Sequence, residues 1–118
     1  MQPPIPFRDE RPWGGELWLT RNYNSPSMVK LLTVKPGETL SLQYHHDRAE
    51  FWYVISGNGT AEIDGKETML EAGLTCFVPK EIKHRLKGGN ETLSILELAF
   101  GRFDENDIVR LEDKYGRS

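Results

Sequence analysis

The segment SLQYHHDRAEFW, residues 41–52, places a glutamine, two histidines, an arginine and a glutamate close together in the chain. Gln43 and His45 are two residues apart in an alternating run, so on a β-strand their side chains point to the same face. Glu50 opens the next run of β-forming residues, and a hairpin of the two runs would bring its carboxylate beside the other two groups. The pattern predicts that an amide, an imidazole and a carboxylate meet at one site.

A further imidazole comes from the segment VPKEIKHRL, in which His84 stands at the start of a predicted strand, five residues after Pro79. Two imidazoles, a carboxylate and an amide oxygen form a mixed nitrogen and oxygen donor set that suits a divalent transition metal. Three or four such ligands with one open position are typical of a catalytic metal site. Histidines in polar loops are more often solvated or structural, so the spacing alone leaves both interpretations open.

The rest of the chain predicts the strands that would hold these groups. Short runs of β-forming residues end at turn residues about every eight to twelve positions, which is typical of an all-β sandwich or barrel. The predicted strands cover residues 28–34, 40–45, 50–56, 60–64, 66–70, 74–79, 84–89 and 92–100. Asp64-Gly65 is a strong hairpin signal. We expect a proline-rich arm before the strands, a short helix or tail over 104–117, and a closed barrel or jelly roll with an internal cavity.

Length and composition narrow the class of protein. The 118 residues fit a single domain over 1–118. Since apolar runs are too short for a membrane span and the start lacks a signal-peptide pattern, we expect a cytoplasmic protein that contacts no membrane. A net charge of −3 without a long basic stripe argues against nucleic acid as a partner. Cys76 is the one cysteine, which excludes an intramolecular disulfide, and its apolar surroundings predict a small buried hydrophobe.

The segment GETLSLQYHHDRAEFWYVISG, from Gly37 to Gly57, resembles the first sequence motif of the cupin superfamily. That motif is a glycine, two histidines separated by one residue, a glutamate and a second glycine. His45, Glu50 and Gly57 match it, whereas Gln43 stands where the motif has its first histidine.

The segment GLTCFVPKEIKHRLKG resembles the second cupin motif through Gly73, Pro79 and His84. It departs from that motif at two positions. Glu81 replaces a glycine and Gly88 replaces an asparagine. Both departures concern turn positions and leave the expected ligand, His84, in place.

The glutamine at position 43 is similar to that of the cupin domain in type II mannose-6-phosphate isomerases. The chain also resembles that family in RPWG, residues 11–14, and in DIVRLEDKYGR, residues 107–117. The resemblance implies an all-β cupin double-stranded β-helix, a jelly-roll barrel, that interconverts mannose 6-phosphate and fructose 6-phosphate or a close analogue. In many members a mannose-1-phosphate guanylyltransferase domain precedes the cupin domain. This chain has no room for it, so we do not expect pyrophosphorylase activity.

The metal ligands that the resemblance implies are Gln43, His45, Glu50 and His84. We expect a divalent ion, zinc first, with manganese, cobalt, iron and nickel as alternatives. Arg48 lies in the loop between ligands, and a guanidinium suits bidentate phosphate binding. We therefore assign Arg48 both substrate contact and a catalytic role.

Further residues are candidates for catalysis, for substrate contact or for the base. Lys83 is the second catalytic candidate. The expected substrate contacts are Arg48, Trp52, Arg85 and Glu97, although a regular strand with His84 inward would turn Arg85 outward. Candidates for the base are His46, Asp47, Glu97, Lys83 and Tyr115, and the tail cations Arg110 and Arg117 are placed to fold over the mouth of the barrel.

Two other functions remain open at this stage. A non-catalytic module that binds a metal and a sugar would use the same residues. A cupin oxygenase would use the two histidines and the carboxylate as an iron triad. The partner expected in any case is a small sugar phosphate, and the likeness to other small cupins implies a homodimer.

Overall fold

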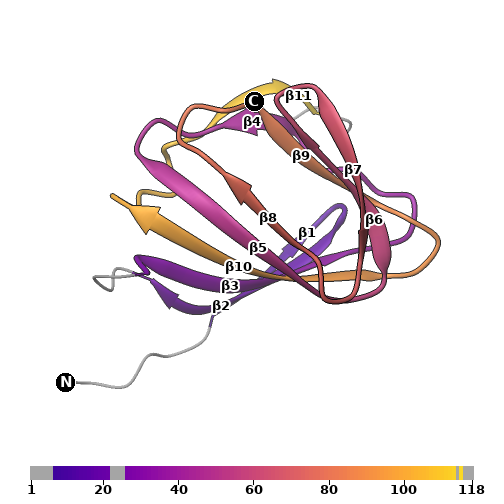
Figure 1. Cartoon of the computed structure of the whole chain (residues 1–118). Coiled ribbons are helices and arrows are strands. Elements are labelled where there is room, and N and C mark those ends of the chain that lie inside the picture. The colour runs from indigo at the N-terminus through magenta and orange to yellow at the C-terminus, as the bar shows by residue number, and fades with distance from the viewer. Residues whose placement is uncertain (1–6, 22–25, 114, 116–118) are drawn as a thin grey trace.

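The computed structural model describes residues 7–21, 26–113 and 115, and of residues 19–21 it describes the backbone alone. The strands are β1 Phe7–Arg11, β2 Gly14–Arg21, β3 Met28–Val34, β4 Leu42–Tyr44, β5 Arg48–Ser56, β6 Asn58–Ile63, β7 Lys66–Glu71, β8 Thr75–Val78, β9 His84–Gly88, β10 Leu93–Gly101 and β11 Val109–Glu112. They form two antiparallel sheets that face each other, and Figure 1 shows the barrel that these sheets enclose. The predicted all-β jelly roll is confirmed.

One sheet has the strand order β1-β2-β3-β10-β5-β8 and the other has the order β11-β4-β9-β6-β7. Alternation along the strands decides which side chains enter the barrel. In β5 and β10 every second residue is buried, and these residues include Glu50 and Glu97 as well as apolar side chains. Carboxylates therefore replace hydrophobic residues at inward positions of two neighbouring strands.

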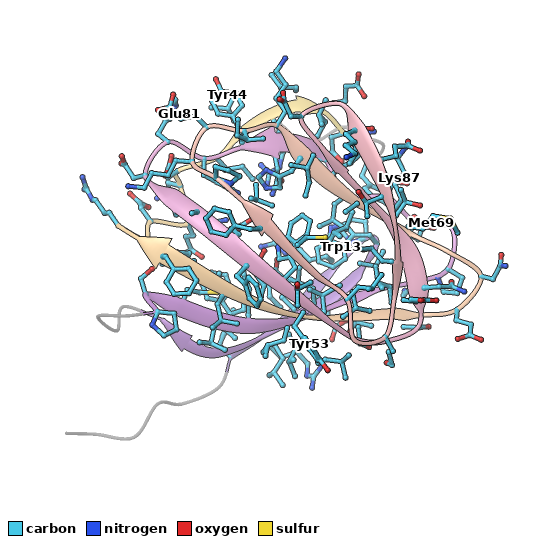
Figure 2. All side chains as sticks on the ribbon, in the orientation of Figure 1. Trp13, Tyr44, Tyr53, Met69, Glu81 and Lys87 are labelled. Carbon is cyan, nitrogen blue, oxygen red and sulfur yellow. The ribbon has the colours of Figure 1, made fainter. Side chains whose placement is uncertain are left out.

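The apolar part of the interior packs between the two sheets and extends to these carboxylates, since Trp52 contacts Glu97. Its members are Trp13, Leu32, Val34, Trp52, Val54, Ala61, Leu70, Val78, Leu86, Leu93 and Ile95. Figure 2 shows Trp13 inside the barrel, while Tyr53 and Met69 point outward. Cys76 packs against this core but is half-buried and not fully buried as predicted, and this burial raises the pKa of its thiol. The homodimer expected from the likeness to other small cupins stays a prediction.

The predicted hairpin of residues 40–45 and 50–56 is wrong. β4 pairs with β9 and β11, whereas β5 pairs with β10 and β8 in the opposite sheet. The connection at His46 and Asp47 crosses between the sheets, and the Asp107 carboxylate accepts both of their backbone N–H groups at 2.9 Å. Gln43 and Glu50 consequently approach the same interior from opposite walls.

Of the short helix or tail expected over 104–117, the helix is wrong for the described residues, since this segment contains β11. Val109 and Arg110 pair with Tyr44 and Gln43 on β4. Because β4 would otherwise expose unpaired backbone groups at the sheet edge, the added strand protects that edge. The described part of the chain forms no helix at all, and so none that could cross a membrane.

Two turns have left-handed residues that are not glycine. The predicted hairpin at Asp64-Gly65 is confirmed, with φ of 52° and 79° between β6 and β7. Asparagine and aspartate followed by glycine tolerate such angles in a tight hairpin. Glu81 has φ of 64°, and it occupies the position at which the second cupin motif has a glycine. The missing glycine therefore leaves a strained residue three positions before His84.

Glu81→Gly is expected to stabilise the protein by about 0.5–1 kcal/mol. The left-handed conformation costs a residue with a Cβ about 1–2 kcal/mol, and the greater freedom of glycine in the unfolded chain offsets about 0.5–1 kcal/mol of this. Urea unfolding measures the difference. Glu71→Gly in β7 is the control, because an ordinary strand position should lose stability. Equal losses of stability in the two variants would contradict a strained backbone at Glu81.

Candidate metal centre

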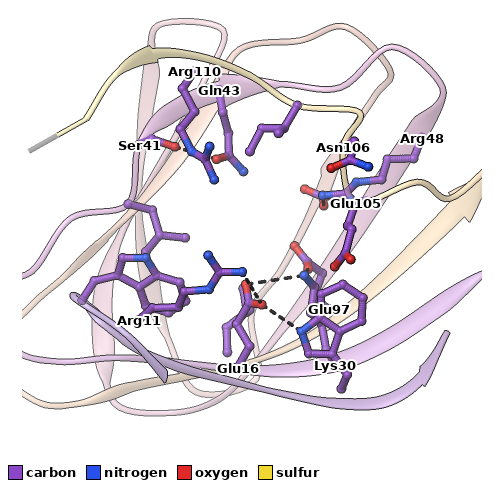
Figure 3. Close-up of a pocket in the computed structure, with 16 residues that line it drawn as sticks. Arg11, Glu16, Lys30, Ser41, Gln43, Arg48, Glu97, Glu105, Asn106 and Arg110 are labelled. Carbon is purple, nitrogen blue, oxygen red and sulfur yellow. Dashed lines mark hydrogen bonds and ion pairs between the residues drawn. The ribbon is translucent and has the colours of Figure 1, made fainter. Parts of the chain in front are cut away.

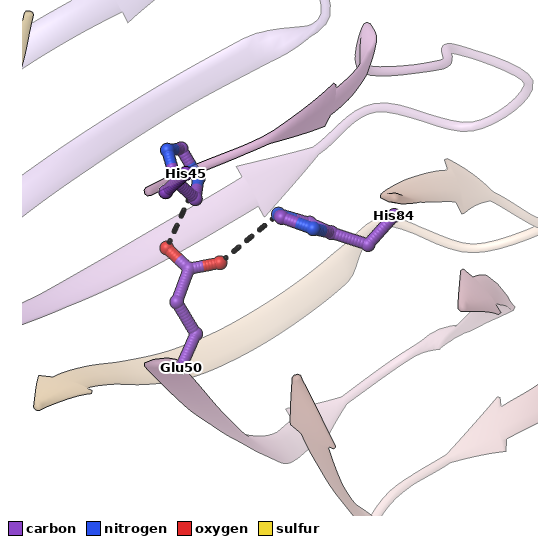
Figure 4. A group of neighbouring side chains, drawn as sticks. All are labelled: His45, Glu50 and His84. Carbon is purple, nitrogen blue, oxygen red and sulfur yellow. Dashed lines mark ion pairs between the residues drawn. The ribbon is translucent and has the colours of Figure 1, made fainter. Parts of the chain in front are cut away.

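His45, Glu50 and His84 meet in the interior of the barrel from three different segments. His45 follows β4, Glu50 is in β5 and His84 begins β9. All three side chains are buried, and one potential ligand atom from each lies within 4.8 Å of the others. Figure 4 shows the Glu50 carboxylate between the two imidazoles, with its oxygens 3.7 Å from His45 Nε2 and 3.2 Å from His84 Nε2.

Backbone carbonyls orient both imidazole rings. His45 Nδ1 is 2.7 Å from the Asp107 carbonyl oxygen, and His84 Nδ1 is 2.8 Å from that of Ile82. In the neutral tautomer that these contacts favour, each Nδ1–H donates and each Nε2 keeps a lone pair. Metal-binding histidines in proteins are fixed in this manner by their second nitrogen.

The cluster contains polar atoms that the described protein residues leave unsatisfied. With Nδ1 protonated, His84 Nε2 and Glu50 Oε1 are two buried acceptors facing each other, and neither has a hydrogen-bond partner among the described residues. Such a pair requires either a proton on His84 or a cation between the two atoms. Two imidazole nitrogens and a carboxylate form a donor set that suits a divalent transition metal. This group can therefore bind a metal ion.

Electrostatics within the cluster keep the potential ligands in suitable protonation states. Burial lowers the pKa of His45 to about 4, so this imidazole is neutral at pH 7. Burial alone would raise the pKa of Glu50, but the adjacent His84 imidazole, 3.2 Å away, and the Arg48 charge hold it below its ordinary value. Burial likewise opposes charge on His84, yet its contacts with Glu50 raise its pKa. The carboxylate is thus ionised, as a metal ligand must be.

Gln43 lies across the barrel from Glu50. It pairs with His84 in the β4–β9 register, and it lines the same cavity as Glu50. The Ser41 hydroxyl donates to Gln43 Oε1 at 2.6 Å and so orients the amide. The amide is therefore beside His84 in the sheet and open to the cavity.

Arg48 is the first residue of β5 and not part of a loop. Its Nη2 is 3.1 Å from His45 Nε2 and 3.2 Å from Glu50 Oε2, and its guanidinium carbon lies 5.1 Å from the centre of the Phe103 ring. The guanidinium is a buried cation in direct contact with two potential ligands. It also lines the cavity, so it faces any molecule that enters.

A cavity of about 470 Å³ opens beside the cluster. Its cationic lining residues are Arg11, Lys30, Arg48 and Arg110, and its carboxylates are Glu16, Glu50, Glu97 and Glu105. Figure 3 shows these charged side chains converging on one space from both sheets. Balanced charge of this density favours a polar, charged ligand over an apolar one.

The cavity contains a second group of charged residues, and the sequence did not predict that these residues contact one another. Lys30 Nζ is 3.5 Å from Glu16 and 3.7 Å from Glu97, and it lies 4.0 Å above the Trp18 ring. Arg11 adds a contact of 3.7 Å with Glu16. The signal was present in MVKLLTV, because alternation puts Lys30 on the buried face of β3.

Other predicted site residues lie elsewhere. Lys83 is exposed and lines no part of the cavity, and Arg85 donates to Glu112 at 3.1 Å on the outer side of the five-stranded sheet. Trp52 is buried behind the cavity wall. Its Nε1 donates to Glu97 at 2.9 Å, and its ring packs edge-on against His84 with 5.7 Å between centroids.

The candidate bases and tail cations also separate by position. His46 and Asp47 are exposed, and the Tyr115 hydroxyl donates to the Glu38 carboxylate. None of these three lines the cavity, whereas Glu97 does. Of the tail cations, Arg110 lines the cavity and Arg117 lies outside the described residues.

Glu97→Gln is expected to change how stability of the metal-free protein depends on pH. Burial raises the pKa of Glu97 from 4.5 to about 7, so the folded protein holds a proton that the unfolded chain releases. The resulting stability is fully present below pH 4.5 and is lost as pH rises through 7, by about 3 kcal/mol in total. The free energy of unfolding in urea is measured at pH 5 and pH 8 for wild type and for Glu97→Gln. Titrations that the two proteins share cancel in the difference between them. Identical pH dependence in both would contradict the raised pKa.

Comparison with known proteins identifies the family. Residues 7–113 match the family model described as Mannose-6-phosphate isomerase C-terminal. The chain belongs to this family. The resemblance drawn from the Gln43 motif and the terminal segments is thereby confirmed.

The curated relatives of this chain are much longer proteins. The xanthan biosynthesis protein XanB of Xanthomonas campestris is 42% identical over 115 residues, covering 92% of this chain and 23% of that protein. The alginate biosynthesis protein AlgA of Pseudomonas aeruginosa is 43% identical over 115 residues, covering 92% and 22%. A mannose-1-phosphate guanylyltransferase of Escherichia coli is 38% identical over 111 residues, covering 91% and 23%. The chain therefore spans about a quarter of the length of the curated relatives it matches.

Solved structures agree on the fold. The capsular polysaccharide assembling protein CapF of Staphylococcus aureus has a TM-score of 0.75 at 19% identity, over 92% of this chain and 33% of CapF. The nucleoside dehydratase Pac13 of Streptomyces has a TM-score of 0.76 at 16% identity, over 92% of this chain and 86% of Pac13. At these identities the likeness establishes the cupin-type barrel and nothing about the reaction.

Proposed function

We propose that this domain is a metal-dependent aldose–ketose isomerase that interconverts mannose 6-phosphate and fructose 6-phosphate or a close analogue. The observation that carries the proposal is the buried group of His45, Glu50 and His84, whose carboxylate faces a cavity lined by four cationic side chains. Membership of a family described by mannose-6-phosphate isomerase supports the substrate class.

We assign the metal to Gln43, His45, Glu50 and His84, with zinc as the first choice and manganese, cobalt, iron or nickel as alternatives. A divalent ion polarises the oxygens at C1 and C2 of a bound sugar and stabilises the negative charge that develops on them. The protein fixes the donor atoms before binding, through the carbonyls at Ile82 and Asp107 and the Ser41 hydroxyl.

Charge in the cavity suits an anionic sugar. The four cations and four carboxylates balance when all are ionised, so a divalent ion adds two positive charges that a phosphate dianion neutralises. Arg48 lies against the ligand atoms, and we assign it to the sugar oxygens near the reacting carbons. Arg11 and Arg110 come from strands at the ends of the two sheets and approach the cavity from different sides (Figure 3), and we assign them to the phosphate.

Turnover of a panel of sugars tests the function. The protein is loaded with zinc, manganese or cobalt, and mannose 6-phosphate, glucose 6-phosphate and unphosphorylated mannose are followed by proton NMR. We expect formation of fructose 6-phosphate from mannose 6-phosphate and at least a hundredfold lower kcat/KM for mannose, because the phosphate contacts contribute about 3 kcal/mol or more. Metal and hexose phosphate binding without any turnover would contradict the isomerase and support a non-catalytic binding module.

A further inference from the structure

We infer that Glu97 is the base that carries the proton between C1 and C2 of the sugar. The inference rests on the proposed isomerase function and assigns a residue to its central chemical step. It stands on the placement of Glu97 in the cavity, on the contacts that fix its carboxylate, and on the positions of the other candidate bases.

The strand register places Glu97 beside the metal ligands without making it one of them. Glu97 on β10 is opposite Trp52 on β5, and the next inward pair along the same strands is Ala99 with Glu50. Glu97 and Glu50 are therefore diagonal neighbours on one face of the sheet, with backbone positions about 7–8 Å apart. Both side chains line the cavity, so a sugar whose C1 and C2 oxygens approach Glu50 presents those carbons to Glu97.

Two contacts fix the carboxylate of Glu97. Oε1 accepts the indole N–H of Trp52 at 2.9 Å, and Oε2 lies 3.7 Å from Lys30 Nζ. Trp52 also packs against His84, so one residue sets the relative position of the base and the metal-binding imidazole. A carboxylate that two contacts hold in place beside the substrate space needs little reorganisation during proton transfer.

The charges around Glu97 balance it between its two protonation states. Lys30 from β3 and Arg48 from β5 favour the carboxylate, whereas Glu50 from β5 opposes it. Glu16 from β2 shares Lys30, and His84 from β9 also senses the charge of Glu97. Burial raises the pKa of Glu97 to about 7, which suits a group that must both accept and return a proton near neutral pH.

Other carboxylates and candidate bases are less well placed. Glu16 is within reach of two cations, Arg11 and Lys30, and of the Trp18 indole, whereas Glu97 contacts one cation and one indole, so fewer lone pairs of Glu16 are left for a substrate. His46, Asp47, Lys83 and Tyr115 do not line the cavity. Among the candidates that the sequence offered, Glu97 is the one that faces the substrate space.

The proposed step balances without an oxidant or reductant. Glu97 removes the proton from C2 of the open-chain aldose, the C2–H electron pair forms a C1–C2 double bond, and the carbonyl pair moves onto O1. Glu97 then returns the proton to C1, the C1–C2 double-bond pair forms the new C1–H bond, and a carbonyl forms at C2. The hydroxyl proton of O2 is transferred to O1, which leaves the ketose.

Isomerisation in D₂O tests the inference. Metal-loaded wild type and Glu97→Gln are supplied with mannose 6-phosphate, and NMR follows both fructose 6-phosphate formation and deuterium at its C1. We expect deuterium incorporation by the wild type and a loss of about 10²–10⁴-fold in kcat for Glu97→Gln. The variant should retain its metal, because Glu97 is not among the ligands. Glu97→Asp should keep part of the exchange, and Glu62→Gln on the five-stranded sheet is the control for loss of one carboxylate.

The outcomes separate this inference from the function on which it rests. Loss of metal from Glu97→Gln together with its activity would overturn the base, because the carboxylate would then act through the metal site, and the isomerase would stand. Glu97→Gln activity within about threefold of wild type would overturn it as well. A metal-loaded wild type that converts no hexose phosphate would remove both the function and the base.

Discussion

Replacement of His84 by alanine is expected to abolish stoichiometric metal binding and to lower the isomerisation rate by at least about a thousandfold. His84 supplies one of two imidazole Nε2 atoms, and its Nδ1 is held by the Ile82 carbonyl. Loss of a ligand leaves too few donors to hold a divalent ion, and the ion contributes several kcal/mol to transition-state stabilisation. Elemental analysis after dialysis measures the metal, and the NMR assay measures turnover.

His46→Ala is the matched control for this prediction. His46 is next to the predicted ligand His45 in sequence, but its side chain is exposed and packs edge-on against Tyr44 at 5.4 Å between centroids. Metal content and kcat should stay within about twofold of wild type. If His84→Ala kept its metal and its activity, or if both variants lost them equally, the assignment of the site would fail.

Arg48→Gln is expected to separate metal binding from substrate recognition. Its Nη2 is 3.1–3.2 Å from His45 Nε2 and Glu50 Oε2, so removal of this positive charge should strengthen cation binding at the same atoms. The variant should nevertheless lose about 10–100-fold in kcat/KM, because a charge-assisted hydrogen bond to the sugar contributes about 1.5–3 kcal/mol. Calorimetric titration with zinc and the kinetic assay report the two effects separately.

Arg85→Gln serves as the comparison for Arg48. Arg85 was predicted from sequence to contact the substrate, but it pairs with Glu112 outside the cavity. Its loss should leave kcat/KM within about threefold of wild type. Weaker zinc binding in Arg48→Gln, or a larger kinetic loss in Arg85→Gln, would show that the guanidinium assignments are wrong.

The local pattern of the chain predicted that His45, Glu50 and His84 lie together, and the structure brings these three residues into one group. Gln43, His45 and Glu50 occur within one motif, and alternation together with the Pro79–His84 spacing was enough to place the second imidazole at the start of a strand. The motif did not reveal how the strands pair. A short connection permits both a hairpin and a crossing between sheets, and here the Asp107 carboxylate stabilises the crossing.

The remaining wall of the cavity depends on contacts between distant parts of the chain. Arg11, Glu16, Lys30 and Glu97 come from β1, β2, β3 and β10, and β10 lies beside β3 in the sheet although six strands separate the two in the sequence. Each is an ordinary charged residue until pairing of β3 with β10 brings Lys30 opposite Glu97. The sequence offered one sign of this cavity wall, a charged residue at a position of an apolar strand that alternation predicts to be buried. Similarly, the tail became β11 because β4 offered an edge that no local pattern indicates.

A titration of metal into chelated protein tests the central claim most directly. Zinc, manganese or cobalt is added in steps to the chelated chain, and bound metal and the rate of fructose 6-phosphate formation from mannose 6-phosphate are measured in the same samples. We predict that turnover rises in proportion to occupancy and reaches its maximum at about one ion per chain, because the described residues form one such cluster, of His45, Glu50 and His84. Turnover that is already maximal in the chelated protein, or absent at full occupancy with every metal, would contradict a metal-dependent isomerase.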